Sequence, residues 1–406
     1  MRLGVQRHVV GRFQRVVAQR DRLDVVLDDR HRDRAADRRA AADRRAAGHR
    51  PEQDERIDAL PADEGGEDAS EGPSEGPAGP RRIGEFEIIS RLGLAYHQEL
   101  SGERVMTGLR HYAYLKISEG CDRTCAFCAI PDIRGRYVST PVDELVAEAE
   151  FLASEGVKEL ILIAQDLTCY GIDLSGRQML PLLVRRLSEV KGIEWIRLHY
   201  LYPSGFPLEL LDMMQSDAKI CRYIDLPIQH ISDNVLRMMR REHNESDTRA
   251  LLKEIRRRVP DAAIRTTVIA GHPGETERDF SSLLSFIGEF RFDRLGAFRY
   301  SHEDETFASL NYSDEIPEKT KEKRVARIME LQQKISGELN DSKRGRTMKV
   351  IVDRKEGLFH VARSQHDSPE VDQEILITSK VKIEPGTFID VKITGSTEFD
   401  LYAEPA

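Results

Sequence analysis

The fold is decided by residues 111–136, HYAYLKISEGCDRTCAFCAIPDIRGR, in which an apolar run leads directly into closely spaced cysteines. Residues 112–118 are rich in aromatic and β-branched side chains, which predicts a strand. Cys121, Cys125 and Cys128 follow it with the spacing C-x3-C-x2-C. Three of the five cysteines of the chain therefore fall in one loop, which we expect at the carboxyl end of a strand.

From residue 112 to residue 316 the sequence alternates between strand and helix patterns. The expected strands are 112–118, 158–166, 194–201, 222–228, 263–271 and 294–301. The expected helices are 141–156, 179–192, 207–217, 232–243, 246–261 and 274–290. Such alternation is typical of parallel strands joined by right-handed crossovers. We predict an α/β fold, a complete or partial (β/α) barrel over 112–316, with its site where the strands end.

The C-terminal part of the chain changes pattern. A connecting helix is expected over 317–343, and period-two alternation then predicts strands within 347–356, 358–365, 374–379 and 387–404. These strands favour a small all-β barrel over 344–406. Residues 346–406 contain eight Lys and Arg against eleven Asp and Glu. An acidic module is poorly suited to nucleic-acid phosphates and better suited to a basic protein.

The N-terminal part has a different composition from the rest. Residues 1–81 are rich in Arg, Ala, Asp, Gly and Pro, and the first lysine of the chain is Lys116. This composition predicts a disordered extension and linker, followed by a connecting segment over 82–111. A nucleic-acid-binding arm is the alternative interpretation. The composition would also suit a GC-rich gene read in the wrong frame or from a wrong start.

Bulk composition restricts the class of protein. The formal net charge of −9 argues against a protein that coats nucleic acid non-specifically. No apolar run approaches the roughly 18 residues that a bilayer span requires, so we expect no membrane association. An odd number of cysteines clustered in one loop is unlike a disulfide framework, which favours a reducing cytoplasm and a metal site.

The cysteine loop indicates which metal group it could hold. A structural zinc site normally has four ligands, and the loop offers no fourth cysteine or histidine. Three thiolates suit a four-iron cluster and leave one iron open to a substrate or cofactor. A zinc site completed by a distant ligand is the alternative. Cys169 and Cys221 are expected to be core or loop residues.

With these motifs in place, the chain resembles the radical S-adenosylmethionine (SAM) superfamily and, more narrowly, its methylthiotransferase family. The resemblance covers about residues 82–404 and is nearest to the members that modify an aspartate of ribosomal protein S12. The C-terminal module resembles a TRAM domain. Besides the opening stretch, the motifs are LILIAQDLTCYG (160–171), WIRLHYLYPSGFP (195–207), IDLPIQHISDNVLRMMRR (224–241) and AGHPGETERDF (270–280).

The resemblance implies a transferase that adds a methylthio group to the β-carbon of an aspartate. In the superfamily the open iron chelates SAM, and an electron cleaves the sulfonium to a 5′-deoxyadenosyl radical. The implied partners are the ribosomal protein and a low-potential donor such as flavodoxin or ferredoxin, and a monomer is expected. A tRNA adenosine methylthiotransferase is the alternative within the family. A non-catalytic zinc- or RNA-binding protein is the alternative of another class.

The resemblance also implies two cofactor positions. Phe127 matches the aromatic position that lies near the adenine of SAM. Gln165 and Asp166 stand where the family has its motif for the SAM amino group, and could hydrogen-bond an ammonium or ribose. Asp166 could instead cap a helix.

Further candidates follow the later strands. Gly271 lies in a glycine turn that would let the backbone approach a ligand, and Glu275 there could be a first-turn acid of the next helix. Gln229 and His230 are expected to face the barrel mouth as cofactor or substrate contacts. His199, at the end of the third strand, is expected to be packed.

One feature of the family is missing from the sequence. The resemblance implies a second cluster, held by three cysteines of an N-terminal domain, yet no cysteine precedes Cys121. Either the start of the gene is damaged or sulfur insertion has been lost. We expect one cluster, and SAM cleavage without sulfur insertion.

Overall fold

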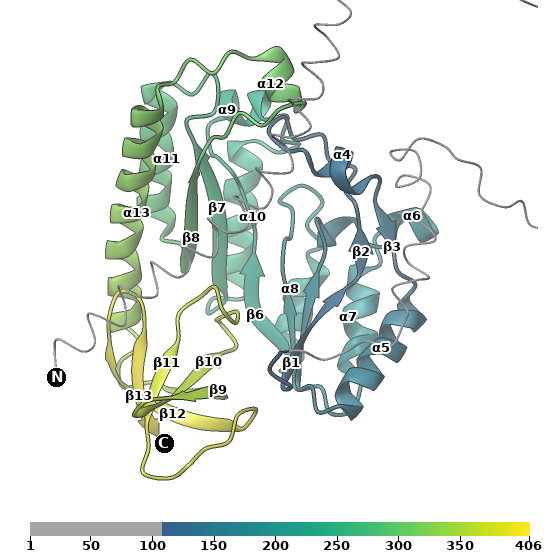
Figure 1. Ribbon diagram of the computed structural model, residues 1–406, viewed down its shortest axis with the longest axis vertical. Helices are drawn as coiled ribbons and strands as arrows, with labels where there is room; N and C mark the ends of the chain where they lie inside the picture. Colours follow the sequence, from purple (N-terminus) through teal and green to yellow (C-terminus); the bar gives the residue numbers. More distant parts are fainter. Residues whose placement is uncertain (1–107) are drawn as a thin grey trace, which may run out of the picture. The chain divides into compact units, whose positions relative to one another are not determined.

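The computed structural model describes residues 108–406, so the expectations for residues 1–107 lie outside the described residues. A parallel six-stranded sheet, ordered β1-β4-β5-β6-β7-β8, forms the first layer of the fold (Figure 1). Its strands are β1 (Tyr112–Lys116), β4 (Glu159–Ile163), β5 (Trp195–Leu198), β6 (Ile220–Asp225), β7 (Ala263–Ala270) and β8 (Arg294–Arg299). All five pairings are parallel, which confirms the predicted α/β architecture as a partial barrel.

Helices pack on one side of this curved sheet because their apolar faces and the strands share one core. They are α5 (Val142–Ser154), α7 (Leu180–Ser188), α8 (Glu209–Ser216), α10 (Glu245–Arg258) and α11 (Glu277–Phe290). Local signals fix their ends. Asn244 accepts a hydrogen bond from the backbone of Asp247 at the start of α10, and Thr276 and Asp279 form a capping box at the start of α11.

The predicted helix over 232–243 is too long. Helix α9 (Asp233–Met238) ends early because Arg240 has a left-handed backbone, with φ of 54°. This turn directs Arg241 back toward the barrel, where its Nη2 donates to the carbonyl of Pro227. Elements that the sequence did not predict are the short pieces β2 (Ser118–Glu119), β3 (Val138–Ser139), α4 (Ile130–Arg134), η1 (Leu167–Cys169), α6 (Ile172–Ser175) and α12 (Phe307–Asn311).

The long connecting helix α13 (Glu318–Asp341) leads into a closed five-stranded barrel ordered β10-β11-β13-β12-β9. Its strands are β9 (Thr347–Glu356), β10 (Phe359–Ser364), β11 (Ile375–Thr378), β12 (Phe388–Ser396) and β13 (Leu401–Pro405). The barrel has an apolar core of its own, and we call it the β-module. A turn between Thr397 and Asp400 divides the expected 387–404 segment into two strands.

Buried charges join the β-module to the sheet. Glu159 of β4 and Arg197 of β5 are both 0% exposed and form a 2.8 Å ion pair. Arg363 of β10 pairs with the same glutamate at 2.5 Å and with Asp353 of β9 at 2.8 Å. Because a buried charge is tolerated only when paired, this network fixes where the β-module sits on the sheet. Within residues 108–406, no helix is both long and apolar enough to cross a bilayer.

Candidate functional site

The cysteine loop leaves the sheet through a turn that requires glycine. Gly120 has φ of +79°, and a Cβ at this position would lie 2.0 Å from the carbonyl oxygen of Arg136. The small antiparallel pair β2–β3 holds both ends of the loop, and the backbone N–H of Cys121 donates to Gly135 at 3.2 Å. The loop is therefore closed on itself before any metal binds.

The three cysteines predicted as ligands line one cavity of about 340 Å³. Neighbouring elements hold the loop around it. The N–H of Ala126 donates to Met239 at 2.9 Å, and the N–H of Ala308 donates to Ala126 at 2.7 Å. The cavity is lined by Cys121, Asp122, Arg123, Thr124, Cys125, Cys128, Pro131, Asp132, Gly135, Arg136, Arg240 and Phe307.

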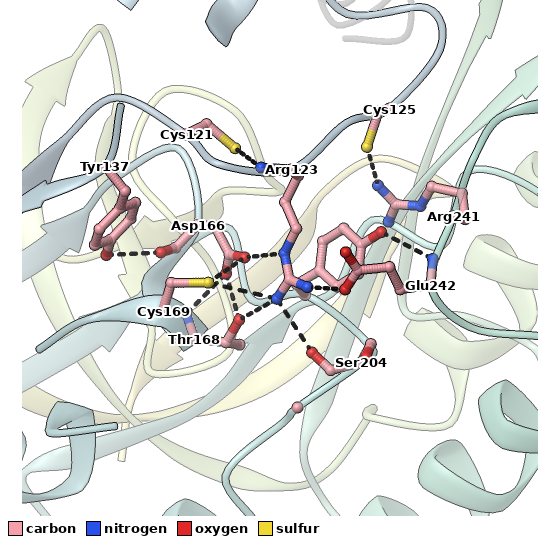
Figure 2. A network of polar contacts seen from close by, with 12 residues as sticks. Cys121, Arg123, Cys125, Tyr137, Asp166, Thr168, Cys169, Ser204, Arg241 and Glu242 are labelled. Atoms are coloured by element: carbon pink, nitrogen blue, oxygen red, sulfur yellow. Dashed lines mark hydrogen bonds and ion pairs between the residues drawn. The ribbon is translucent and has the colours of Figure 1, made fainter. Parts of the chain in front are cut away.

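Two N–H donors point at the cysteine sulfurs (Figure 2). The backbone N–H of Arg123 lies 3.4 Å from Cys121 Sγ, and Nη1 of Arg241 lies 3.3 Å from Cys125 Sγ. The guanidinium groups of Arg123 and Arg241 each lie 4.0 Å from the centroid of the Tyr202 ring, which orients both. Donors to ligand sulfurs are among the means by which proteins tune iron–sulfur clusters.

Asp166 accepts hydrogen bonds from both Arg123 and the backbone of its own loop. One carboxylate oxygen accepts Nε of Arg123 at 2.9 Å, and the other accepts the N–H of Thr168 at 2.8 Å as the cap of η1. Arg123 also pairs with Glu242. Asp166 is 2% exposed. The capping alternative for Asp166 is therefore what the structure shows, and its carboxylate acts by positioning Arg123 beside the cysteine loop.

The protonation of the thiols bears on metal binding. Burial raises the pKa of Cys121 to about 11 and raises the pKa of Cys128 as well. In the metal-free loop both thiols are neutral at pH 7, so metal binding must release protons. Among residues 108–406, no three His, Cys, Asp or Glu side chains converge closely enough to hold a single metal ion. Three thiols around one cavity, with N–H donors at two of them, fit an iron–sulfur cluster.

The glycine turn after β7 lies beside the aromatic residue of the loop. Phe127 contacts His272 edge to face, with the ring centroids 6.5 Å apart. Gly271 has φ of +83°, and its N–H donates to the carboxylate of Glu275. The alternative of a first-turn acid does not apply to Glu275, because α11 begins at Glu277. Glu275 instead closes the glycine turn from within, 3.3 Å from Arg324.

The remaining predicted residues differ in accessibility. The side chain of His230 is fully buried rather than facing the barrel mouth, because its Nδ1 accepts the N–H of Ser232 at 3.0 Å. Gln229 is half-buried, with φ of 67°. Gln165 donates to Glu119 at 3.4 Å. His199 is packed, as predicted, and bonds Ser368 Oγ at 2.9 Å.

Two residues at the cysteines were not found from the sequence. Arg123 lies inside the motif but carries no signal of its own there. Arg241 is 116 residues from Cys125, and only the fold brings them together. Arginines spaced so far apart leave no local pattern, so the sequence offered no basis for predicting either contact.

Comparison with known proteins agrees with this geometry. Residues 115–287 match the radical SAM superfamily, and residues 345–405 match the TRAM domain. Coproporphyrinogen III oxidase from Escherichia coli, described as a radical SAM enzyme, aligns at 19% identity over 61% of this chain and 57% of its own, with a TM-score of 0.44. A structural similarity of this size adds nothing to the assignment.

Curated relatives match far more closely. Ribosomal protein uS12 methylthiotransferase RimO from Parabacteroides distasonis is 51% identical over 81% of this chain and 77% of its own. The protein of the same name from Flavobacterium johnsoniae is 53% identical over 79% of this chain and 73% of its own. Identity of this extent, over about four fifths of the chain, means that the chain belongs to the RimO family of radical SAM methylthiotransferases.

Proposed function

We propose that this member of the radical SAM methylthiotransferases acts on ribosomal protein uS12 and directs its radical to the β-carbon of an aspartate. The observation that carries the proposal is the three-cysteine cavity at the carboxyl end of β1 in a chain 51% identical to a uS12 methylthiotransferase. The acidic β-module, with eight basic and eleven acidic residues over 346–406, supports a basic protein over tRNA as the substrate.

Different residues of the chain would hold the cluster and contact the other cofactor. Cys121, Cys125 and Cys128 would hold a four-iron cluster, which with SAM supplies the radical that activates a C–H bond. Arg241 donates a hydrogen bond toward Cys125 Sγ and would stabilise negative charge there. Phe127, beside the turn at Gly271, is placed to pack on a flat ring of the cofactor.

Two further candidates lie on other strands. Gln165 follows β4, and its Oε1 is a buried acceptor with no hydrogen-bond partner among the described residues, which suits an ammonium donor. Gln229 follows β6 and likewise has a buried Oε1 without such a partner. We propose both as cofactor or substrate contacts. The buried His230 is a poorer candidate for direct contact.

The cysteine inventory bears on how far the reaction goes. Cys121 is the first cysteine of the sequence, and the three loop cysteines form one ligand set. We infer one cluster per chain, which cleaves SAM when reduced but does not insert sulfur. A low-potential donor such as flavodoxin or ferredoxin would supply the electron. We expect the chain to be a cytoplasmic monomer when it binds the ribosomal protein.

The test is anaerobic incubation of the reconstituted chain with SAM, a reductant and purified uS12. The proposal predicts 5′-deoxyadenosine that increases when uS12 is added, because substrate binding couples radical formation to hydrogen abstraction. Mass spectrometry of uS12 then reports whether a methylthio group is added. No stimulation by uS12, together with stimulation by tRNA, would contradict the substrate assignment. A methylthiolated product would contradict the one-cluster inference alone.

A further inference from the structure

A second cavity, of about 440 Å³, lies at the carboxyl ends of β1, β4 and β5 and is not used by the cysteine loop. Its lining includes Lys116, Gln165, His199, Tyr200, Arg265 and Val371. We propose that this cavity receives the carboxylate of the acidic side chain that is modified, with Lys116 and Arg265 as the residues that select it. The inference rests on the proposed function and names what recognises its substrate.

The charge of the cavity points to an anion. Lys116 and Arg265 are its only charged lining residues, and both are cations. Lys116 pairs with Glu119 at 2.8 Å, and its side chain remains 37% exposed. Their carboxylate partners, Glu119, Asp225 and Asp372, lie outside the lining, so the charged atoms that the cavity itself presents are donors and favour a negatively charged ligand group.

Arg265 retains hydrogen-bonding capacity. Its Nη1 lies 3.3 Å from Asp225, and its Nε lies 3.6 Å from Asp372, both longer than the usual charge-assisted hydrogen bond of about 2.7–2.9 Å. Within residues 108–406, Nη1 is the only atom of this side chain that makes a hydrogen bond, and the side chain is 23% exposed. A guanidinium has five N–H donors in a planar fork, so Arg265 can bind a carboxylate while Asp225 and Asp372 hold it in place.

The β-module forms one wall of the cavity. Val371 belongs to the β10–β11 loop (365–374), which reaches across to the sheet. Ser368 Oγ bonds His199 at 2.9 Å, and Asp372 accepts the hydroxyl of Tyr223 at 2.8 Å. Arg197 donates to the carbonyl of Gln365 at 2.8 Å. A wall fixed at three points gives the cavity a set width, which a selective site requires.

The rim suits a peptide. Tyr200 is 46% exposed and Val371 is 58% exposed, and both line the cavity. Tyr200 has a left-handed backbone with φ of 58°, held by its N–H to Asp225 Oδ2 at 3.2 Å. Strained residues of this kind persist where surrounding contacts determine them and are concentrated at functional sites. An uncharged nucleobase placed here would cover the remaining N–H donors of Lys116 and Arg265 without offering them a negative charge, which disfavours it relative to a carboxylate.

The experiment measures discrimination between two peptides by the reconstituted full chain, with SAM present and no reductant, so that nothing turns over. One fluorescent peptide spans the modified aspartate of uS12, and its twin carries asparagine there. The wild-type chain should bind the aspartate peptide about 10-fold more tightly than the asparagine peptide, because a hydrogen bond to a charged group increases binding affinity by about that factor or more. Arg265→Gln and Lys116→Met should each reduce the ratio toward about twofold or less.

Controls separate selection from folding and from SAM binding. Arg185→Gln removes one exposed arginine of α7, paired with Glu209 far from the cavity, and should leave the ratio unchanged. Arg265→Lys, which keeps the charge, should restore part of the ratio. In reduced samples without peptide, the KM for SAM should be the same in every variant.

The outcomes are distinct. A ratio that survives in both Arg265→Gln and Lys116→Met overturns the inference. So does a raised KM for SAM with an unchanged ratio, because the cations would then serve the carboxylate of SAM. Wild-type binding of both peptides with equal affinity overturns the inference while leaving uS12 as the substrate. Binding of neither peptide contradicts the proposed function, and the inference with it.

Discussion

Gly120 is the residue on which the geometry of the cysteine loop depends most directly. Its φ of +79° places it in a region that other residues adopt at a cost of about 1–2 kcal/mol. In addition, the space a side chain would need is already filled by backbone atoms of Arg136. The glycine of the SEGC sequence therefore serves the turn and the close approach of two backbone segments.

Gly120→Ala should lower the free energy of unfolding by about 2–4 kcal/mol and reduce iron retention, because the turn must open to admit the methyl group. Denaturant unfolding and iron content after reconstitution measure the two effects. Gly156→Ala is the matched control: Gly156 has φ of +96° but open space around it, so only about 1 kcal/mol should be lost. Equal effects in the two variants would show that the backbone contact is unimportant.

Arg241 illustrates a residue whose role only the fold reveals. Its guanidinium donates to Cys125 Sγ, and a hydrogen bond to a ligand sulfur stabilises the reduced, more negative cluster. Arg241→Gln should therefore lower the midpoint potential of the cluster and slow reductive SAM cleavage. A redox titration followed by electron paramagnetic resonance measures the potential. An unchanged potential in Arg241→Gln, with Arg185→Gln as the remote control, would contradict this role.

At the scale of elements, the strand and helix pattern was readable from the sequence. The six parallel strands follow apolar runs such as ELILI over 159–163, and α11 follows a capping-box sequence. The early end of α9 was not readable, because nothing in the sequence marks the left-handed turn at Arg240 that directs Arg241 to the carbonyl of Pro227. The β10–β11 loop has no hydrophobic periodicity, so its packing against the sheet could not be predicted from the sequence.

His199 packs against that loop and bonds Ser368 Oγ at 2.9 Å. Burial lowers the pKa of His199 to about 3, with further lowering by Arg197 and Arg265. The folded state therefore keeps this histidine neutral, whereas the unfolded chain binds a proton near its ordinary pKa of about 6.5. The stability that neutral His199 contributes is present above pH 6.5 and is lost as the pH falls from 6.5 toward 3.

The wild-type free energy of unfolding should therefore fall between pH 7.5 and pH 5.5, and this decrease should be smaller in His199→Gln, by up to about 1.4 kcal/mol. Glutamine can keep a hydrogen bond to Ser368 but cannot titrate. Denaturant unfolding at several pH values measures the slope. A slope identical in the two proteins would contradict the assignment of a depressed pKa to His199.

At the scale of the whole molecule, the β-module and the sheet are joined by charge. Arg363 contacts Glu159 of the sheet and Asp353 of its own module, and all three side chains are at most 7% exposed. Because both carboxylates are buried, water cannot take the place of the arginine if it is removed. The TRAM-like module could be predicted from its period-two pattern, but this ionic contact between distant segments could not.

Arg363→Met should cost about 3 kcal/mol of unfolding free energy, because Glu159 and Asp353 each lose one of two buried partners. Glu159 keeps Arg197, and Asp353 keeps His111. Arg354→Met, in the same module, removes a half-exposed arginine that pairs with Glu356 and Glu374, and should cost about 1 kcal/mol or less. Thermal unfolding of both variants measures the difference. Similar losses in the two would indicate that the network between module and sheet contributes little.

We infer that three cysteines hold a four-iron cluster whose remaining iron is open to SAM. Iron content and electron paramagnetic resonance of the anaerobically reconstituted, reduced chain, before and after SAM is added, test this arrangement. We expect about four irons per chain, a signal that changes when SAM binds, and loss of both in Cys125→Ala. A chain that remains iron-free, or a cluster signal that SAM does not alter, would contradict it.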